Sequence, residues 1–334
     1  MLNNKNILVT GGTGSFGKKF IEMTFKKYKP NKVIVYSRDE FKQDVLKKDI
    51  AAKMPEILPH IRFFIGDVRD KERLYRAFKG VDYVIHAAAM KQVPACEYNP
   101  FEAIKTNIHG AQNIIDAALD CGVKKVVALS TDKAVNPINL YGGTKLVSDK
   151  LFISANAYSG QGGTIFSIVR YGNVAGSRGS VIPFFKGLID RGESELPITD
   201  FNMTRFWITL DQGVELVYKA LDESVGGETY ISKIPSFKIT DLAKAMKADC
   251  ILKEVGIREG EKIHEVMVTK DDSRFTLEFD KHFVIMPHFD WWRESELLKT
   301  GSKLPNGFEY TSGDNKEWLD VEQLRAELKR NGFI

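Results

Sequence analysis

The sequence predicts an α/β fold, a doubly wound parallel sheet that carries a second, smaller lobe. Over residues 1–172, short apolar runs alternate with longer stretches of helical periodicity, as in a series of βαβ units. A glycine-rich turn at residues 11–17 joins the first apolar run to the first helical stretch. Beyond residue 172 the alternation becomes irregular, and 334 residues are enough for one large domain or two closely joined ones.

Six apolar runs are predicted to form the strands of the sheet. They are short and rich in the β-branched residues that favour strands. These runs are Asn6–Thr10, Lys32–Ser37, Ile61–Ile65, Tyr83–His86, Lys125–Ser130 and Thr164–Arg170. The helices predicted between them are Gly14–Phe25, Asp39–Met54, Lys71–Phe78, Pro100–Cys121 and Tyr141–Tyr158. Right-handed crossover connections wind such elements into a doubly wound sheet.

The second half of the chain is expected to complete the sheet and then to build the lobe. Its predicted elements are the helices Val181–Asp190, Asp211–Leu221, Asp241–Lys247 and Glu317–Asn331 and the strands Arg205–Ile208 and Thr229–Ile231. We assign residues 1–172, with roughly 206–232, to the sheet domain, and residues 173–205 and 233–334 to a lobe over the carboxyl edge of the sheet. The aromatic cluster Phe289, Trp291 and Trp292 is expected in the core of that lobe.

The composition predicts a soluble, cytoplasmic protein that binds neither nucleic acid nor a membrane. Of its residues 43% are hydrophobic and 28% charged, and the net charge of +4 is small. No apolar run approaches the roughly 18 residues of a membrane span, and the chain enters its first strand too soon after Met1 to leave room for a signal peptide. The three cysteines are widely spaced, which indicates a reducing compartment, and no ligand spacing predicts a metal.

The turn between the first strand and the first helix is predicted to bind a dinucleotide. Gly11 permits a tight turn, Gly14 lets the backbone approach a pyrophosphate, and Gly17 lets the helix pack closely on the sheet. The positive end of the helix dipole would face the phosphates. Further contacts within this turn are expected from Thr13, Ser15 and Phe16. The alternative is a turn with a purely structural role.

The tip of the second strand favours NADP over NAD. An NAD site usually places an acid there to hold the ribose 2′-hydroxyl, whereas this chain has Ser37 and Arg38, with Lys42 one helical turn later. Those donors suit a 2′-phosphate, although Asp39 follows directly. The alternative is that Arg38 and Lys42 form only a solvated helix start. Additional cofactor contacts are expected from Asp67, Val68 and Ala87.

Tyr141 and Lys145 lie one helical turn apart, after a strand that ends in Ser130-Thr131. A nearby ammonium stabilises a phenolate, so Lys145 is expected to lower the pKa of Tyr141 below its ordinary value of about 10. Such a phenolate can take a hydroxyl proton while a nicotinamide takes the carbon-bound hydride, and Lys145 can also hold the nicotinamide ribose. The pair therefore predicts a redox enzyme, and the alternative is an exposed helix pair.

Asp132 and Lys133 form a second acid/base pair directly after Thr131. Alcohol oxidation alone does not require this pair, so we expect a further proton abstraction at the same site. Lys133 would act as the base if burial or nearby cations keep it neutral. The alternative is a surface ion pair in a loop.

These motifs together resemble the extended short-chain dehydrogenase/reductase superfamily and, within it, the nucleotide-sugar 4,6-dehydratases. The resemblance covers essentially the whole chain, through residues 11–17, 86–89, 130–133, 141–145 and 170–173. Sugar-retaining members carry Thr-Asp-Glu where this chain has Thr131-Asp132-Lys133. That difference, together with Met90-Lys91 after the alanine run, looks like the inverting dehydratases that act on UDP-N-acetylglucosamine.

The resemblance implies a complete reaction. C4 of the sugar would be oxidised, Lys133 would take the C5 proton that the new ketone acidifies, and Asp132 would help the C6 hydroxyl to leave as water. Hydride return to C6 would regenerate a tightly bound NADP in each cycle. Reprotonation of C5 on the opposite face would invert it from D-gluco to L-arabino. Enzymes of this kind begin the pseudaminic acid route used in flagellin glycosylation.

The resemblance also implies contacts with the UDP-sugar. Lys91 is expected near the nicotinamide or the reacting carbons, and Thr106 near the cofactor unless it only packs its helix. The expected substrate contacts are Lys91, Asn173, Val174, Arg178, Arg205, Arg258 and Glu261. An arginine suits a diphosphate because its planar fork holds two oxygens at once. Without the family context, Arg205 and Arg258 would each be interpreted as surface charges.

Three other functions stay open. A UDP-hexose 4-epimerase would leave Asp132 and Lys133 idle, a retaining dehydratase would need the glutamate missing at position 133, and a non-catalytic NADP sensor would not need an intact Tyr141–Lys145 pair. Members of the superfamily pair through helices corresponding to Pro100–Cys121 and Tyr141–Tyr158. We therefore expect a homo-oligomer, and relatives of this subfamily form hexamers.

Overall fold

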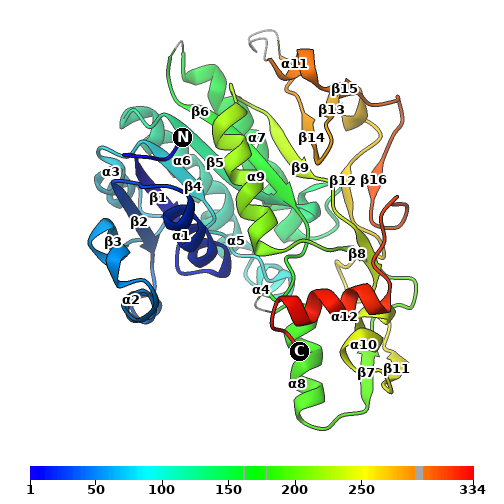
Figure 1. The fold of residues 1–334 in the computed structure, drawn as a ribbon. Coiled ribbons are helices and arrows are strands. Elements are labelled where there is room, and N and C mark those ends of the chain that lie inside the picture. Colours follow the sequence, from blue (N-terminus) through cyan, green and yellow to red (C-terminus); the bar gives the residue numbers. More distant parts are fainter. Residues whose placement is uncertain (161, 178, 290–295) are drawn as a thin grey trace.

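The computed structural model describes residues 1–160, 162–177, 179–289 and 296–334 and is built around one ten-stranded sheet (Figure 1). In order across the sheet its strands are β15 (Ser302–Lys303), β13 (Thr276–Glu278), β14 (His282–Ile285), β9 (Thr229–Ser232), β6 (Ile165–Tyr171), β5 (Lys125–Thr131), β4 (Tyr83–His86), β1 (Asn6–Thr10), β2 (Lys32–Ser37) and β3 (Ile61–Ile65). The strands from β9 to β3 are parallel, and each of the other three is antiparallel to its neighbours. The predicted doubly wound parallel sheet is confirmed.

Helices cover both faces of this sheet (Figure 1). On one face, α1 (Ser15–Lys27) packs against α9 (Leu210–Glu223), and on the other α6 (Gly110–Asp120) lies between α3 (Lys71–Phe78) and α7 (Leu140–Tyr158). The central strand β1 shows why both faces are needed, because Ile7 and Val9 belong to the apolar core of one face and Leu8 to that of the other. Strands buried on both faces are continuous apolar runs rather than alternating ones.

The predicted helices of the first half match the structure to within two residues at each end, except for Pro100–Cys121. That stretch consists of α5 (Pro100–Ile104), a π-helical turn η2 (Lys105–His109) and α6, and the short helix α4 (Val93–Tyr98) precedes it. A π turn inserts an extra residue into a helix and is frequent at functional sites. Here it contains Thr106 and Asn107, both buried beside the cleft described below.

The smaller lobe has an apolar core of its own. It is formed by α8 (Val181–Asp190), α10 (Ile239–Met246), α12 (Val321–Arg330) and the strand pair β7 (Glu195–Ile198) and β11 (Ile251–Glu254), at the lower right of Figure 1. There are two more strand pairs, β8 (Thr204–Phe206) with β10 (Ser236–Lys238) and β12 (Val266–Val268) with β16 (Tyr310–Thr311). Met267, Val268 and Tyr310 of the second pair belong to the apolar core on the sheet. The terminal helix begins at Val321 rather than Glu317, because Asp320 and Gln323 form a capping box.

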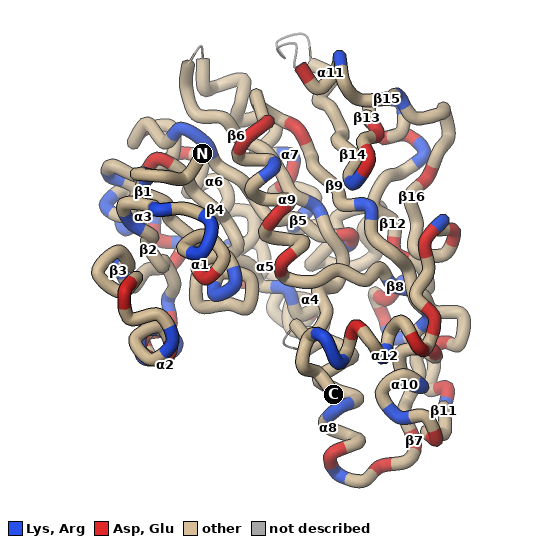
Figure 2. Tube along the Cα trace, viewed as in Figure 1, with Lys and Arg blue, Asp and Glu red and all other residues tan. Residues whose placement is uncertain are grey.

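Two features of the second half differ from expectation. Strands β13, β14 and β15 come from residues 233–334, which we assigned to the lobe, yet they extend the main sheet. Phe289 is 45% exposed, so it is not a core residue, and Trp291 and Trp292 lie outside the described residues. Lys and Arg are interspersed with Asp and Glu along the chain, as Figure 2 shows.

Candidate active site

A cleft of about 1060 Å³ extends from the carboxyl ends of the parallel strands to the lobe. It includes the place between β1 and β4 where the strand order reverses, which is the usual ligand site of a doubly wound sheet. The predicted site residues that line it are Gly11, Thr13, Gly14, Ser15, Phe16, Gly17, Ser37, Arg38, Asp39, Lys42, Asp67, Val68, Ala87, Lys91, Thr106, Thr131, Lys133, Tyr141, Lys145, Asn173, Val174, Arg205, Arg258 and Glu261. Asp132 is buried beside Lys133, and Arg178 lies outside the described residues.

The turn at residues 11–17 is shaped for close approach by a phosphate. Gly11 has a φ of 64°, in the left-handed region that favours glycine, and its amide donates to the carbonyl of Tyr36 at 2.9 Å. A Cβ on Gly17 would lie 2.5 Å from the backbone of Gly12, so only glycine lets α1 start this near to β1. Gly14 caps α1 without a side chain, which leaves the first-turn amides free of a side-chain cap. The turn fits a dinucleotide pyrophosphate.

The acidic residue at the tip of β2, Asp39, already has hydrogen-bond partners within the protein. The Asp39 carboxylate caps the helix α2 (Glu40–Lys53) by accepting from the Lys42 amide at 2.9 Å, and it pairs with the Lys42 ammonium at 2.6 Å. These hydrogen bonds from Lys42 lower the pKa of Asp39. Arg38 is exposed and lies 3.7 Å from Asp67. Asp39 is thus tied to the helix start, while the guanidinium of Arg38 lines the cleft.

Tyr141, Lys145 and Asp149 succeed one another along one buried face of α7. The alternative of an exposed Tyr–Lys pair is therefore wrong. Asp149 was not predicted, although its spacing of four residues from Lys145 places it on the same face. Its Oδ2 accepts from the hydroxyl of Ser130 at 2.5 Å. Burial lowers the pKa of Lys145 and raises that of Asp149, and the attraction between the two charges partly offsets both effects.

The expectation that Lys145 lowers the pKa of Tyr141 is not met. Burial of the phenol raises this pKa to about 12, because a phenolate loses hydration there. The effects that oppose burial come from the charge of Lys133 and from a hydrogen bond with Thr131. Among the effects that favour the phenolate, the charge of Lys133 is thus the largest.

Lys133 lies among three oxygen acceptors. Its Nζ donates to Asp132 Oδ1 at 3.2 Å, to Asn173 Oδ1 at 3.1 Å and to Glu265 Oε1 at 3.2 Å. The two carboxylates are each only 1% exposed, so the alternative of a surface ion pair is wrong. Burial acts to lower the pKa of Lys133, but the two carboxylates outweigh it and the pKa is raised. The expected neutral lysine is therefore an ammonium in this structure.

The short turn η3 (Asp132–Ala134) positions both members of the pair. The hydroxyl of Thr131 caps this turn, accepting from the Lys133 amide at 3.3 Å and donating to Asp132 Oδ1 at 2.8 Å. The start of α7 packs directly on the same turn, because a Cβ on Gly142 would overlap the carbonyl oxygen of Lys133. The glycine after Tyr141 thus sets how closely the phenol approaches Lys133.

Asn107 is a second residue that the sequence analysis missed. Its amide accepts from the Met90 backbone nitrogen at 2.8 Å and donates to the Met90 carbonyl at 2.9 Å and to Thr144 Oγ1 at 3.0 Å. This clamp joins the loop that carries Lys91 to the helix that carries Tyr141. The neighbouring hydroxyl of Thr106 is buried, lines the cleft and has no partner among the described residues, so it is available to a ligand.

The arginines at the lobe end of the cleft differ in environment. Arg205 is buried, donates to the carbonyls of Thr204 at 2.7 Å and Ile263 at 3.1 Å, and lies 3.6 Å from Glu265. Its interpretation as a surface charge is wrong. The side chain of Arg258 is 63% exposed and lies 3.9 Å from Glu261 at the cleft rim. Glu265, unlike Glu261, was not predicted, since nothing in the local sequence points it toward Lys133.

Membrane-spanning helices and groups of metal-ligating side chains are both absent from the described residues. Among residues 1–160, 162–177, 179–289 and 296–334, no helix has the length and apolar character that a membrane crossing requires. Over the same described ranges, no three or more His, Cys, Asp and Glu side chains are grouped so that they could hold a metal ion.

Comparison with known proteins gives the family. Residues 7–287 match the family described as polysaccharide biosynthesis protein. The UDP-N-acetylglucosamine 4,6-dehydratase (inverting) of Campylobacter jejuni serotype O:2 is 54% identical over 330 residues, which are 97% of each chain. A UDP-glucose 4-epimerase of Rickettsia akari is 43% identical over 342 residues, 100% of this chain and 98% of that one. The X-ray structure of Pen from Bacillus thuringiensis is 37% identical, covers 100% of both chains and superposes with a TM-score of 0.90. This protein thus belongs to the polysaccharide biosynthesis protein family.

Proposed function

We propose that this protein is a UDP-N-acetylglucosamine 4,6-dehydratase that inverts C5, with UDP-2-acetamido-2,6-dideoxy-β-L-arabino-hex-4-ulose as its product. One observation carries the proposal: Lys133 forms an ion pair with the buried carboxylate of Asp132 and lies beside Tyr141 at the carboxyl end of β5. The relative in Campylobacter jejuni that bears this name is 54% identical over nearly the whole chain. The protein is accordingly a dehydratase rather than a simple alcohol dehydrogenase.

The site residues divide the proposed chemistry among them. Tyr141 accepts the proton of the C4 hydroxyl, and bound nicotinamide supplies the place where a hydride is taken up and from which it is returned. Lys133 takes the proton from C5, and the electrons of that C–H bond form the C5–C6 double bond. Asp132, once it has taken up a proton, gives that proton to the C6 oxygen, which leaves as water. A proton added to C5 from the opposite face then completes the inversion.

NADP is the proposed cofactor. Ser37, Arg38 and Lys42 supply donors around the tip of β2, and the Asp39 carboxylate is engaged at the start of α2. We expect NADP to bind at least tenfold more tightly than NAD, a difference of about 1.4 kcal/mol, and Arg38→Ala to remove most of that preference. Isothermal titration with both cofactors decides between them, and equal affinities would contradict NADP specificity.

A UDP-hexose 4-epimerase is the second candidate, because relatives of that name are 42–43% identical over the full chain. An epimerase needs only oxidation, rotation and reduction at C4, so the buried group of Asp132, Lys133 and Glu265 would have no task. The structure makes a retaining dehydratase a stronger alternative than the sequence does, because a glutamate lies in the site. The glutamate missing from position 133 has a counterpart in Glu265, which touches Lys133 from the lobe side.

The deciding experiment is NMR of the purified protein with UDP-N-acetylglucosamine in D2O and no added cofactor. A 4-keto-6-deoxy product with deuterium at C5 and L-arabino configuration supports both the proposed reaction and a tightly held NADP. First accumulation of the D-xylo ketone indicates retention. A C4 epimer with an intact C6 hydroxyl identifies an epimerase, and NADP binding without turnover identifies a sensor.

The biological setting is proposed on the family resemblance alone. The protein would act in the cytoplasm as a homo-oligomer. Its product would enter the pseudaminic acid route, which is used in flagellin glycosylation. Exposed Phe101 and Val147 on α5 and α7 offer apolar contacts for pairing through these helices. Sedimentation velocity tests the assembly, and a hexamer is the expected species.

A further inference from the structure

Glu265 is a buried carboxylate with no role in the reaction as described so far. It directly precedes β12 and is 1% exposed, although it lines the cleft. Its Oε1 accepts from Lys133 Nζ at 3.2 Å across 132 residues of sequence and faces the Nε of Arg205 at 3.6 Å. Its Oε2 is buried and has no hydrogen-bond partner among the described residues.

Lys133 cannot take the C5 proton while it is an ammonium, so its own proton must first move. Asp132 Oδ1 already accepts from both Thr131 and Lys133, and the proposed reaction needs the Asp132 proton for the C6 oxygen. Glu265 differs in that its Oε2 accepts from none of the described residues. A buried carboxyl oxygen without a donor is costly as an anion and less costly once it carries a proton.

We infer that Glu265 is a positioning residue that holds Lys133 at the cleft and accepts its proton, so that Lys133 becomes a base without releasing a proton to solvent. The inference rests on the proposed dehydratase function. One proton moves from Lys133 Nζ to the Glu265 carboxylate, and the neutral amine of Lys133 then takes the proton from C5. The C5–H electron pair becomes the C5–C6 double bond as the C6–O bond breaks, and the departing oxygen takes a proton from Asp132, which enters this step as a carboxylic acid.

Other charged groups face this pair from several elements. Arg205 on β8 and Lys262 before β12 are cationic neighbours, and Lys91 adds positive charge from the loop after β4. Tyr141 on α7 and Asp132 in η3 complete the surroundings of Lys133. These cations repel the charge of the Lys133 ammonium and so make its loss of a proton easier, and Glu265 Oε1 at 3.2 Å is an acceptor within reach.

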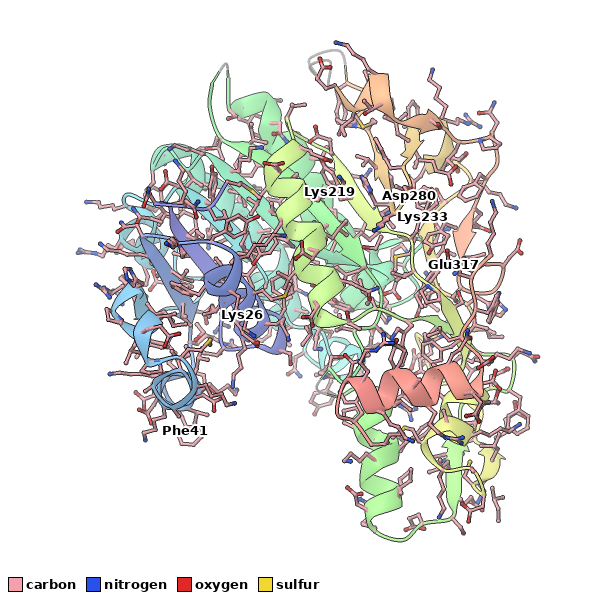
Figure 3. All side chains as sticks on the ribbon, in the orientation of Figure 1. Lys26, Phe41, Lys219, Lys233, Asp280 and Glu317 are labelled. Carbon is pink, nitrogen blue, oxygen red and sulfur yellow. The ribbon has the colours of Figure 1, made fainter. Side chains whose placement is uncertain are left out.

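The first test measures the protonation of Lys133 directly and does not depend on catalytic turnover. The 13Cε resonance of Lys133, assigned by its loss in Lys133→Arg, is followed against pH in the wild type and in Glu265→Gln. Removing an anion at contact distance lowers the pKa of Lys133 in the variant by about one to three pH units. An unchanged titration would overturn the inference. Glu278→Gln is the matched control, because Glu278 forms an ion pair with Lys233, labelled in Figure 3, away from the cleft.

The second test is the pH dependence of deuterium exchange at C5. With Glu265 present the proton stays within the pair, so kcat/KM is level over about pH 6 to 9. In Glu265→Gln, Lys133 must lose its proton to solvent, so kcat/KM falls about 100-fold at pH 7 and then rises about tenfold per pH unit. Glu265→Asp keeps a carboxylate and restores the level profile at a lower rate, which separates proton transfer from a folding defect.

The outcomes separate this inference from the function on which it rests. A wild type that converts UDP-N-acetylglucosamine while Glu265→Gln keeps a level pH profile overturns the role of Glu265 alone. A wild type that forms no dehydrated sugar overturns the proposed function, and the resonance titration still decides whether Glu265 controls the proton on Lys133.

Discussion

In the proposed mechanism the chemistry of this site depends on Lys133, which stands where sugar-retaining relatives are expected to carry a glutamate. Two buried carboxylates hold it as an ammonium, and its positive charge acts to lower the pKa of Tyr141 against the effect of burial. Under the proposed function this one side chain would serve two steps: it would favour the phenolate needed for oxidation, and it would take the proton during elimination.

Replacing Lys133 with glutamine should stop elimination. Lys133→Gln removes the base and leaves two buried carboxylates without their cation, so dehydration falls by about 10²- to 10⁴-fold, the usual contribution of general acid–base catalysis. Product formation is measured by NMR. The surface variant Lys219→Gln removes only a helix ion pair and should keep wild-type turnover (Figure 3). Dehydration at the wild-type rate in Lys133→Gln would exclude Lys133 as the base.

His86 should make the protein lose stability in mild acid. It is buried against Phe152, its Nδ1 is 2.9 Å from Thr10 Oγ1, and burial with the charge of Lys145 lowers its pKa to about 3. The unfolded chain binds a proton below about pH 6.5, whereas the folded one does not. Stability from this group is thus complete above that pH and falls by about 1.4 kcal/mol per pH unit on going lower.

Urea denaturation at several pH values measures this effect. His86→Asn is less stable than the wild type at neutral pH because it leaves the packing against Phe152, but it should lose less stability between pH 7 and 5, by about 2 kcal/mol. Parallel pH dependences of the two proteins would show that His86 is not the responsible group.

At the scale of elements, the important junction is the contact between η3 and the start of α7. Parallel strands bring Thr131, Tyr171 and His86 to the same edge of the sheet, but only the packing of α7 on η3 brings Tyr141 to Lys133. The Asn107 clamp adds the loop of Lys91 to the same junction, through a π turn that lets the amide reach Met90.

Two adjacent glycines test that junction. Gly142→Ala places a methyl group against the Lys133 carbonyl and should destabilise the protein by at least about 2 kcal/mol and lower turnover, because backbone rather than a flexible side chain must move. Gly143→Ala meets nothing within 4 Å and should stabilise α7 by about 0.5–1 kcal/mol with unchanged turnover. Thermal unfolding measures both, and equal effects of the two changes would refute the close packing.

At the scale of the whole molecule, the cleft joins residues from the sheet and from the lobe. The expected cofactor contacts come from the sheet domain, after the ends of β1 to β4 and from η2 and α7, whereas Arg205, Arg258 and Glu261 come from the lobe. A ligand bound to the sheet domain and a ligand bound to the lobe should therefore each stabilise the fold, because a ligand that binds only the folded state shifts the unfolding equilibrium.

NADP and UDP should each raise the melting temperature, and together more than either alone. At a concentration about 100 times its Kd, each ligand adds about 2.7 kcal/mol of stability. Differential scanning calorimetry measures the shifts, with inorganic phosphate at equal concentration as the control. A shift with NADP but none with UDP would contradict the proposed nucleotide-sugar contacts of the lobe.

The sequence alone was sufficient for the parallel sheet. Its strands are continuous apolar runs buried on both faces, so each run could be located to within about two residues from local pattern, and so could each intervening helix except Pro100–Cys121. The cleft followed from the same information, since parallel strands end at a common edge and the glycine turn lies there. Of the predicted site residues that the structure describes, all except Asp132 line this cleft.

Tertiary structure alone decided the protonation of the site and the construction of the lobe. Glu265 meets Lys133 across 132 residues, and Asp149 changes the environment of Lys145 only because both are buried. Strands of two to four residues such as β13 and β15 carry no periodicity to be recognised. Local sequence fixes which residues a strand or helix presents, but a pKa depends on burial and on charges from distant segments, which exist only once the chain has folded.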